Sequence, residues 1–270
     1  MCPSKAVNTT PKPLILAVET SSRIGSVAIA LGEELLAETA FSGPMRHSAE
    51  IFPVIQNLMQ RFARKPHEIE QVHISIGPGS FTGLRIATTL AKTMHLASGA
   101  KIVAVDTLDV IAANVIDFMP ESPDQNSGHE PQGTSHERIV ALLDAKRNQF
   151  FLAVYQRRTH ASRNTNHESQ TTHHGIWEKV VPDCLMTAAQ LMQILTHSDE
   201  PIYLLGDGLL YHRDKFKAKD IRILDEKYWS PRASKVHLLG WRKAVAGQFA
   251  DPLSLQPAYL RKPDVTIKTI

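Results

Sequence analysis

Cysteine is scarce in this chain, which has only Cys2 and Cys184 among its 270 residues. Two cysteines do not supply a disulfide framework, so the disulfide-rich secreted scaffolds are excluded and a reducing compartment is favoured. No apolar run approaches the roughly 18 residues that a membrane span needs. Residues 1–13 lack the apolar core of a secretory signal. The sequence therefore predicts a cytoplasmic protein without membrane contact.

A large excess of one charge is also missing, since the formal net charge is +3 at pH 7. This mildly basic balance permits contact with RNA but does not indicate it, because nucleic-acid-binding proteins usually show a basic cluster. Hydrophobic residues make up 43% of the chain, which is enough for a buried core. A length of 270 residues suggests one large domain or two small ones.

Several familiar catalytic patterns are absent. The chain has no G-x-x-x-x-G-K-[ST] phosphate loop, and Ser80 lacks the G-x-S-x-G surroundings of a nucleophile elbow. Four histidines lie in one polar stretch with irregular spacing and without cysteines or a carboxylate cluster, which favours a solvated insertion over a metal site. These four are His160, His167, His173 and His174.

The chain does contain a glycine-rich run, GPGSFTGLR at 77–85, between an apolar strand-like segment and a helix-like segment. Glycine lets a phosphate or another stretch of backbone approach closely. The N-terminus of the following helix would favour an anion. The run is therefore either a phosphate cradle or a rigid corner for packing.

Hydrophobic periodicity predicts alternating strands and helices in the first half of the chain. Strands are expected at 14–20, 26–31, 35–41, 72–76 and 102–105, and helices at 48–64, 86–98 and 108–117. The predicted order is strand-strand-strand-helix-strand-helix-strand-helix. This is the order of one actin-like half-domain. The later sequence predicts a hairpin at 138–155, a helix at 188–195, a strand at 202–205, a turn at 206–208 and a helix at 233–247.

Two polar stretches interrupt this pattern and have too few apolar side chains to offset the entropy of ordering them. We interpret them as flexible surface insertions. The predicted organisation is a first lobe at 14–117, an insertion at 118–137, a hairpin that completes the lobe junction at 138–156, a second insertion at 157–175, and a smaller second lobe at 176–270.

Five motifs in order resemble the TsaB family of the glycoprotease-like group. They are ILAVETS at 15–21, RHS at 46–48, GPGSFTGLR at 77–85, DAKR at 144–147 and PAYLR at 257–261. The match runs from about Leu14 to Arg261 and leaves out the two polar stretches. The resemblance implies an α/β, actin-like (ASKHA, RNase H-like) fold of two lobes. It also implies a role in the N6-threonylcarbamoylation of adenosine in tRNA.

The resemblance further implies a sister protein of the same fold, TsaD, which carries the catalytic metal site through an H-x-x-x-H motif. In this chain Thr107 and Ile111 occupy the two corresponding positions, and neither supplies a metal ligand. The late region at 230–234 also lacks the carboxylate that TsaD uses there. We therefore expect no catalytic residue, no metal and no tightly bound cofactor, with ATP bound only in an assembled complex.

On this reading the chain is a non-catalytic scaffold that forms a heterodimer with TsaD through two first-lobe helices. The predicted interface residues are Ile51, Ile55, Met59, Phe62, Leu84, Thr88, Ala91, Met94 and His95. The alternative is that these side chains serve only the chain's own sheet. The resemblance also implies the ATPase TsaE in a larger assembly, tRNA contact through the complex, and a homodimer when the chain is alone.

Two enzymatic alternatives stay open: a nucleotide-binding ATPase or phosphotransferase of the actin-like class, and a glycoprotease-like peptidase. We interpret Glu19 as a strand-end carboxylate bonded to the following turn rather than as a group that orients a metal-bound water. His47 and Ser48 either cap the first helix or contact a partner. The turn with Asp144, Lys146 and Arg147 either contacts a nucleotide or RNA or is merely solvated. The loops that would face a nucleotide contain Glu19, Thr20, Ser21, Gly77, Gly79, Ser80, Gly206, Asp207 and Gly208.

Overall fold

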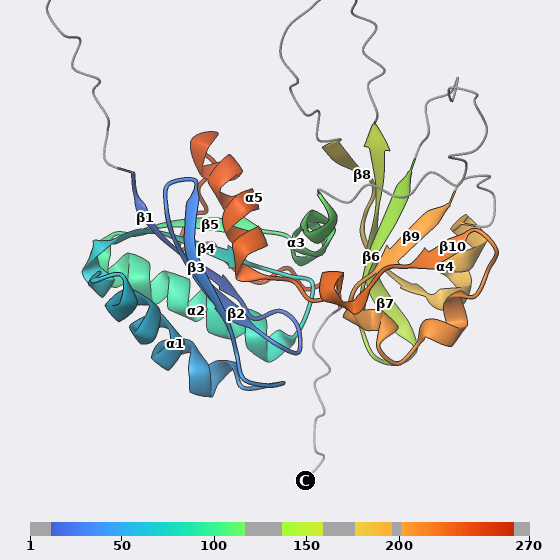
Figure 1. Cartoon of the computed structure of the whole chain (residues 1–270), viewed down its shortest axis with the longest axis horizontal. Helices are drawn as coiled ribbons and strands as arrows, with labels where there is room; N and C mark the ends of the chain where they lie inside the picture. The colour runs from blue at the N-terminus through green and yellow to red at the C-terminus, as the bar shows by residue number, and fades with distance from the viewer. Residues whose placement is uncertain (1–11, 117–136, 159–175, 196–200, 262–270) are drawn as a thin grey trace, which may run out of the picture.

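The computed structural model describes residues 12–116, 137–158, 176–195 and 201–261, which form two lobes side by side (Figure 1). The insertions predicted at 118–137 and 157–175 lie almost entirely outside the described residues. The four histidines of the second insertion also lie outside them. No helix within the described ranges is both long and apolar enough to cross a membrane.

The first lobe is built on a five-stranded sheet in the order β3-β2-β1-β4-β5. The strands are β1 Leu14–Glu19, β2 Ser26–Leu31, β3 Glu34–Ala40, β4 Ile69–Ser75 and β5 Lys101–Val105. Helices α1 (His47–Arg61) and α2 (Phe81–Ser98) cover one face of this sheet, and α5 (Ala233–Val245) covers the other (Figure 1). Strand β1 is buried throughout because both of its faces are covered.

The second lobe repeats this plan with a sheet in the order β10-β9-β6-β7-β8. Its strands are β6 Arg138–Asp144, β7 Gln149–Arg158, β8 Ile176–Thr187, β9 Ile202–Leu205 and β10 Ile221–Ile223. Helices α3 (Thr107–Ala112) and α4 (Ala188–Leu195) pack into the core of this lobe. Short 3-10 helices complete the chain: η1 Pro66–Glu68, η2 Ala113–Val115, η3 Asp207–Leu209, η4 Arg213–Phe216 and η5 Glu226–Tyr228.

The two sheets have the same topology. In each, the first strand pairs antiparallel with the second and parallel with the fourth; the second strand pairs antiparallel with the third, and the fourth parallel with the fifth. A repeated unit of three antiparallel strands followed by two parallel strands is the organisation of the actin-like class. The predicted two-lobed α/β, actin-like fold is confirmed.

The lobe boundaries differ from those expected. The hairpin of β6 and β7 lies at the centre of the second sheet rather than at a junction, because β6 also pairs with β9. Helix α5, expected in the second lobe, packs on the first sheet, where Ala233 and Val236 meet Ala17 of β1 and Ala28 of β2. Strands β8 and β10 did not appear in the sequence prediction.

Helix limits also shift from the predicted ones. Helix α2 begins at Phe81, five positions before the predicted start, because the Ser80 side chain accepts a hydrogen bond from the Gly83 amide and caps the helix. Helix α1 begins at His47, so Ser48 lies inside the helix and is not its cap. Helix α3 ends at Ala112 and continues only as a 3-10 turn.

Candidate functional site

A cleft of about 520 Å³ lies between the two lobes. Four of the five motifs line its walls: the turn after β1, the glycine-rich loop, the β6–β7 turn and the C-terminal segment. The lining residues include Ser21, Gly79, Ser80, Phe81, Asp144, Lys146, Asp207, Tyr211, Tyr259 and Arg261. The tertiary structure thus brings together segments that are more than 200 residues apart in the sequence.

The glycine-rich loop packs against the turn after β1. The Ser80 amide donates to the Ser21 carbonyl at 2.7 Å, and the Thr20 hydroxyl donates to the Gly83 carbonyl at 2.7 Å. A Cβ at Gly79 would lie 2.4 Å from the Ser21 carbonyl oxygen, so only glycine fits. Of the two sequence-based interpretations, this geometry favours the rigid corner, because the loop meets the chain's own backbone.

Gly77, at the start of the same loop, has a φ of +124°, and a Cβ there would meet the Ala258 carbonyl oxygen at 2.6 Å. Its own carbonyl accepts a hydrogen bond from the Thr107 amide at 2.7 Å. The Ala258 amide in turn donates to the Ile76 carbonyl at 2.7 Å. The C-terminal motif is therefore held against the loop by backbone contacts that leave no room for a side chain at position 77.

Glu19 ends β1 and is fully buried. One carboxylate oxygen accepts hydrogen bonds from the amide and the hydroxyl of Ser21, both at 2.5 Å, while Oε2 has no hydrogen-bond partner among the described residues. Burial raises the pKa of the Glu19 carboxyl, and the bonds from Ser21 oppose that rise. Glu19 does not line the cleft, which fits a carboxylate that shapes the turn rather than one that faces a ligand.

The opposite wall of the cleft comes from the second lobe. Gly206 has a φ of +123°, and a Cβ there would lie 2.0 Å from the Leu142 carbonyl oxygen, so the turn at 206–208 presses directly on β6. This close approach places Asp207 at the cleft beside Asp144. Burial acts to raise the pKa of Asp144, but the Lys146 ammonium and amide outweigh it and hold that pKa low.

Asp207 should make stability depend on pH. Burial raises the pKa of Asp207 from 3.8 to about 6. A hydrogen bond from the Asp144 backbone opposes the rise, the Asp144 carboxylate adds to it, and Arg23 and Lys146 oppose it. The folded state therefore holds the proton more tightly than the unfolded state. The stability that this proton contributes is complete below pH 4 and is lost as the pH rises through about 6. A shift of this size corresponds to about 3 kcal/mol.

Asp207→Asn removes this titration. The unfolding free energies of both proteins are measured by urea denaturation between pH 4 and pH 7. The difference, variant minus wild type, should become more positive as the pH rises. The comparison cancels the other titrating groups, which both proteins share. A difference between the two proteins that does not change with pH would contradict the raised pKa.

The C-terminal motif joins the two lobes. The Tyr259 ring lies 4.9 Å from the Phe81 ring, and the Arg85 guanidinium stacks 3.8 Å above Phe81. Arg261 donates to the Ala145 carbonyl and to the Gln149 side chain in the β6–β7 turn. The segment therefore reaches from α2 to the β6–β7 turn across the mouth of the cleft. Arg23 and Tyr211 were missing from the predicted site because no local pattern marks them, and Arg261, the last residue of the PAYLR motif, was not assigned to the site.

His47 is buried, and its Nε2 lies 2.9 Å from the Ser22 carbonyl oxygen. Its ring packs 5.6 Å from Phe41, and burial lowers its pKa. Gly25 makes room for the ring, since a Cβ there would lie 2.7 Å from Nδ1. These contacts anchor the turn after β1 to the start of α1, so the side chain is inside the lobe and not available to a partner.

Six of the nine predicted interface residues are buried in the first-lobe core. They are Ile51, Ile55, Met59, Leu84, Thr88 and Ala91. The apolar stripes of α1 and α2 face their own sheet. The alternative interpretation, that these side chains serve only the chain's own sheet, therefore holds for these six. Phe62, Met94 and His95 are half-buried, and His95 Nδ1 lies 3.0 Å from the Ala100 carbonyl oxygen. Any partner of these helices must contact their opposite face.

Thr107 and Ile111, at the positions of the histidine pair, are both fully buried in α3. Residues 230–234 pack nearby without a carboxylate, and the Ala233 amide donates to the Ser26 hydroxyl at 2.8 Å. In the part of the chain that the structure describes, no group of three or more histidine, cysteine or acidic residues is arranged to hold a metal. The expectation that the chain lacks a metal site stays a prediction.

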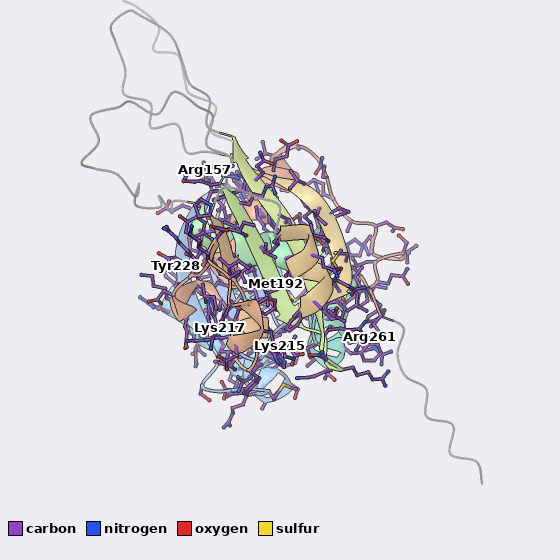
Figure 2. The ribbon with its side chains drawn as sticks, turned by 90° about the vertical axis from the view of Figure 1, so that its right-hand side faces the viewer. Arg157, Met192, Lys215, Lys217, Tyr228 and Arg261 are labelled. Carbon is purple, nitrogen blue, oxygen red and sulfur yellow. The ribbon has the colours of Figure 1, made fainter. Side chains whose placement is uncertain are left out.

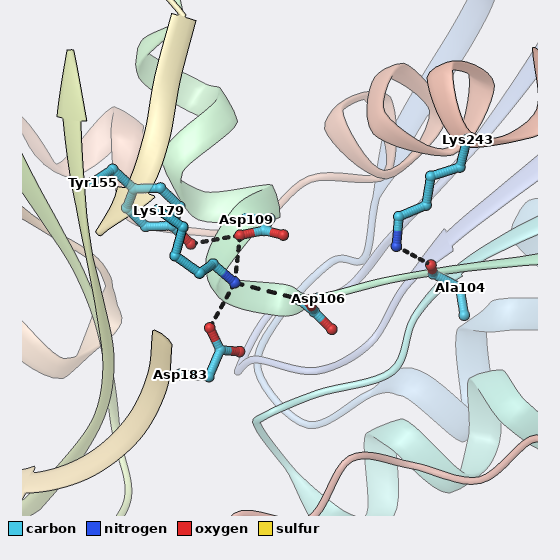
Figure 3. Close-up of polar contacts among 7 residues, drawn as sticks. All are labelled: Ala104, Asp106, Asp109, Tyr155, Lys179, Asp183 and Lys243. Carbon is cyan, nitrogen blue, oxygen red and sulfur yellow. Dashed lines mark hydrogen bonds and ion pairs between the residues drawn. The ribbon is translucent and has the colours of Figure 1, made fainter. Parts of the chain in front are cut away.

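An ion network that sequence analysis missed lies between α3 and β8 (Figure 3). The Lys179 ammonium is 2.7 Å from Asp109 and from Asp183, and 3.8 Å from Asp106. Tyr155 donates to Asp109 at 2.7 Å, and burial beside these carboxylates raises its pKa. The network ties α3 to the second sheet and has a structural role.

Comparisons with known proteins agree with one another. Residues 42–172 match the family described as TsaD, tRNA N6-adenosine threonylcarbamoyltransferase. The tRNA threonylcarbamoyladenosine biosynthesis protein TsaB of Bacillus subtilis is 27% identical over 263 residues, covering 95% of this chain and 97% of that protein. The protein of the same name from Escherichia coli is 22% identical over 247 residues, covering 92% and 94%.

Among solved structures, a Pseudomonas aeruginosa protein described as similar to peptidase YEAZ superposes with a TM-score of 0.69 at 19% identity. The superposition covers 92% of this chain and 100% of that protein's chain. A structure titled YeaZ from the same organism gives a TM-score of 0.68 over the same shares. The sequence relatives span nearly the whole chain, and the structural relatives share its fold. Over nearly its whole length the chain is similar to the TsaB proteins named for tRNA threonylcarbamoyladenosine biosynthesis, and it shares the fold of the YeaZ structures.

Proposed function

We propose that this chain is a non-catalytic subunit of the tRNA threonylcarbamoyladenosine machinery and that it acts by pairing with TsaD. The observation that carries the proposal is the pair Thr107 and Ile111, two fully buried side chains without metal-ligating chemistry where TsaD carries its histidines. A chain with the family's fold but without those ligands is suited to holding the catalytic subunit. The ATPase TsaE would join a larger assembly, and tRNA would be bound through the complex.

The outer face of α1 and α2 is the surface that we assign to TsaD. On α2 the exposed side chains recur every three or four residues and so form one stripe, at Thr82, Arg85, Thr89, Thr93 and Leu96. Phe52 on α1 and Leu96 on α2 are large apolar side chains with exposed fractions of 65% and 82%. The threonines are short enough for another helix to approach closely. When the chain is alone, the same face would pair two copies.

Thr89→Glu should break the complex with TsaD without unfolding the chain. Thr89 lies in the middle of the exposed stripe, where a longer charged side chain would clash with a partner and lose its hydration. Burying an unpaired charge costs several kcal/mol, so the affinity should fall about a hundredfold or more. The measurement is light scattering of the chain mixed with TsaD, together with a thermal melt of each variant.

Lys235→Glu on α5, on the opposite face of the first sheet, is the matched control and should bind TsaD like the wild type. A folded Thr89→Glu variant that binds TsaD at wild-type strength would remove α2 from the interface. Transfer activity of the isolated wild-type chain, in a threonylcarbamoyl transfer assay without TsaD, would overturn the scaffold role itself.

Nucleotide binding is a second candidate, and the cleft between the lobes is the observation that favours it. The predicted nucleotide-facing residues Ser21, Gly79, Ser80 and Asp207 all line this cleft. Against tight binding, the glycine-rich loop meets backbone of its own chain, and the carboxyls of Asp144 and Asp207 would repel phosphate. We propose that ATP binds only in the assembled complex. Equilibrium dialysis with ATP separates the cases, since tight binding by the isolated chain would favour the ATPase alternative.

A further inference from the structure

Cations gather at the β6–β7 turn beside the cleft and along the neighbouring segment 213–219 of the second lobe. We call this set the basic edge: Lys146, Arg147, Arg213, Lys215, Lys217, Lys219 and Arg261. Five carboxylates lie among or beside them, those of Asp144, Asp207, Asp214, Asp220 and Glu226. Positive side chains therefore outnumber negative ones along this edge.

Three separate segments meet to make the basic edge. The Lys215 ammonium donates to the Asn148 side chain, which joins η4 to the β6–β7 turn. Arg261 bonds the same turn from the C-terminal segment. The Phe216 ring packs 5.4 Å from Phe150 and holds η4 against β7. Figure 2 shows Lys217, Lys215 and Arg261 following one another along the lower part of this face.

Four charges of the basic edge, those of Lys146, Lys215, Lys217 and Arg261, are available to a ligand. The bonds of Lys215 and Arg261 go to neutral amide and carbonyl groups and leave their charge uncompensated. Lys146 and Lys217 pair with Asp144 and Asp214, but the two lysine side chains are 79% and 76% exposed. Exposed ion pairs of this kind contribute at most about 1 kcal/mol, so a phosphate competes readily for the cation.

The backbone of the β6–β7 turn is a second, independent observation. Lys146, Arg147 and Asn148 have φ values of +62°, +54° and +60°, three successive residues in the left-handed region. For a residue with a Cβ this conformation costs roughly 1–2 kcal/mol, which glycine would avoid. Strained backbone of this kind concentrates at binding sites. The chain keeps two cationic side chains at positions where glycine would be more stable.

The surroundings of the basic edge suit a nucleic acid better than a protein. The one large apolar residue in 213–219, Phe216, is buried, so this stretch offers no apolar centre for a protein interface. Beside it Tyr211 is 67% exposed at the cleft, with the Arg23 guanidinium 5.6 Å from the centre of its ring. Exposed aromatic rings next to cations stack unpaired bases in RNA-binding proteins.

We propose that the basic edge binds the phosphate backbone of structured RNA, with Tyr211 placed to stack an unpaired base. The inference deepens the proposed function, since a tRNA is the substrate of that machinery, and it assigns direct RNA contact to this chain. The basic edge belongs to the second lobe, away from the α1 and α2 face assigned to TsaD, so one chain holds both partners on different surfaces.

The test uses a triple variant, Lys215→Glu, Lys217→Glu and Lys219→Glu, and an unmodified tRNA transcript as the probe. Binding to the full chain is followed by fluorescence anisotropy from about 50 to about 200 mM salt. The triple variant should bind about tenfold or more weakly at the lowest salt. The slope of log K against log salt should fall by about 2–3, because each lysine that contacts phosphate contributes close to one unit. Tyr211→Ala should weaken binding with little change in that slope.

The matched control reverses three exposed cations of the first lobe, Arg61→Glu, Arg64→Glu and Lys65→Glu, and so changes the net charge equally. It should bind tRNA within about threefold of the wild type, since these cations belong to the other lobe and exposed charges farther away than the Debye length, about 10 Å at 0.1 M salt, are largely screened. Equal weakening by both variants, or wild-type binding by the triple variant, would overturn the proposal. So would a triple variant that keeps tRNA but loses TsaD, since the basic edge would then be a protein contact. If the wild type fails to bind TsaD while its tRNA binding depends on the basic edge, the scaffold role fails and the RNA surface stands.

Discussion

Ala91→Glu should unfold the first lobe. Ala91 lies on the inner stripe of α2, is completely buried, and packs in the core formed by α1, α2 and the first sheet. A glutamate there would carry an unpaired carboxylate into an apolar interior and overfill it. Each effect costs several kcal/mol, whereas a protein of this kind is stable by about 5–15 kcal/mol in total. Met59→Lys, at an almost fully buried position on α1, should act in the same way.

The measurement is thermal unfolding followed by far-UV circular dichroism. Ala91→Glu should lose the cooperative transition or lower its midpoint by more than about 10 °C. Thr89→Glu, two positions away on the exposed stripe of the same helix, serves as the control and should melt like the wild type. Wild-type stability of Ala91→Glu would mean that α2 does not pack on the sheet in the orientation described.

Gly83→Ala should also be strongly destabilising, even though alanine is the better helix former. Gly83 lies in the first turn of α2, where replacing glycine by alanine ordinarily adds about 1 kcal/mol of stability. Here the added Cβ would lie 1.8 Å from the Thr20 carbonyl oxygen, far inside contact distance. Helix α2 would have to move away from the turn after β1, and the hydrogen bond from Thr20 to the Gly83 carbonyl would be lost. We expect a loss of about 3 kcal/mol or more.

Urea denaturation of Gly83→Ala measures this loss directly. Gly43→Ala is the matched control, because the nearest atom to a Cβ at that position is Cδ of the flexible Arg46 side chain, at 3.8 Å. Its unfolding free energy should stay within about 0.5 kcal/mol of the wild type. A stabilised Gly83→Ala would show that helix propensity outweighs the contact, and that the glycine-rich loop is not a rigid corner.

Much of the fold followed from local chemistry. Short continuous runs of apolar residues located β1, β2 and β6, and the turn at 206–208 followed from its two glycines. The five motifs indicated the two-lobed actin-like class, which the repeated strand order confirms. The glycine-rich loop was located in the sequence because glycine is required wherever backbone meets backbone. The sequence did not show whether the loop would meet a ligand phosphate or the chain's own backbone. The tertiary structure decided this by placing the Ser21 and Thr20 carbonyls against the loop.

What covers an apolar helix face was decided only in three dimensions. Helical periodicity shows that Ile51, Met59 and Ala91 share buried stripes, but it does not say whether a sheet of the same chain or a partner buries them. The return of α5 to the first sheet and the gathering of Arg261, Lys146 and Lys215 at one edge depend on contacts between residues more than 60 positions apart. Local sequence sets which side of an element is apolar or charged. Only the packing of distant elements determines which of those sides remain exposed for function.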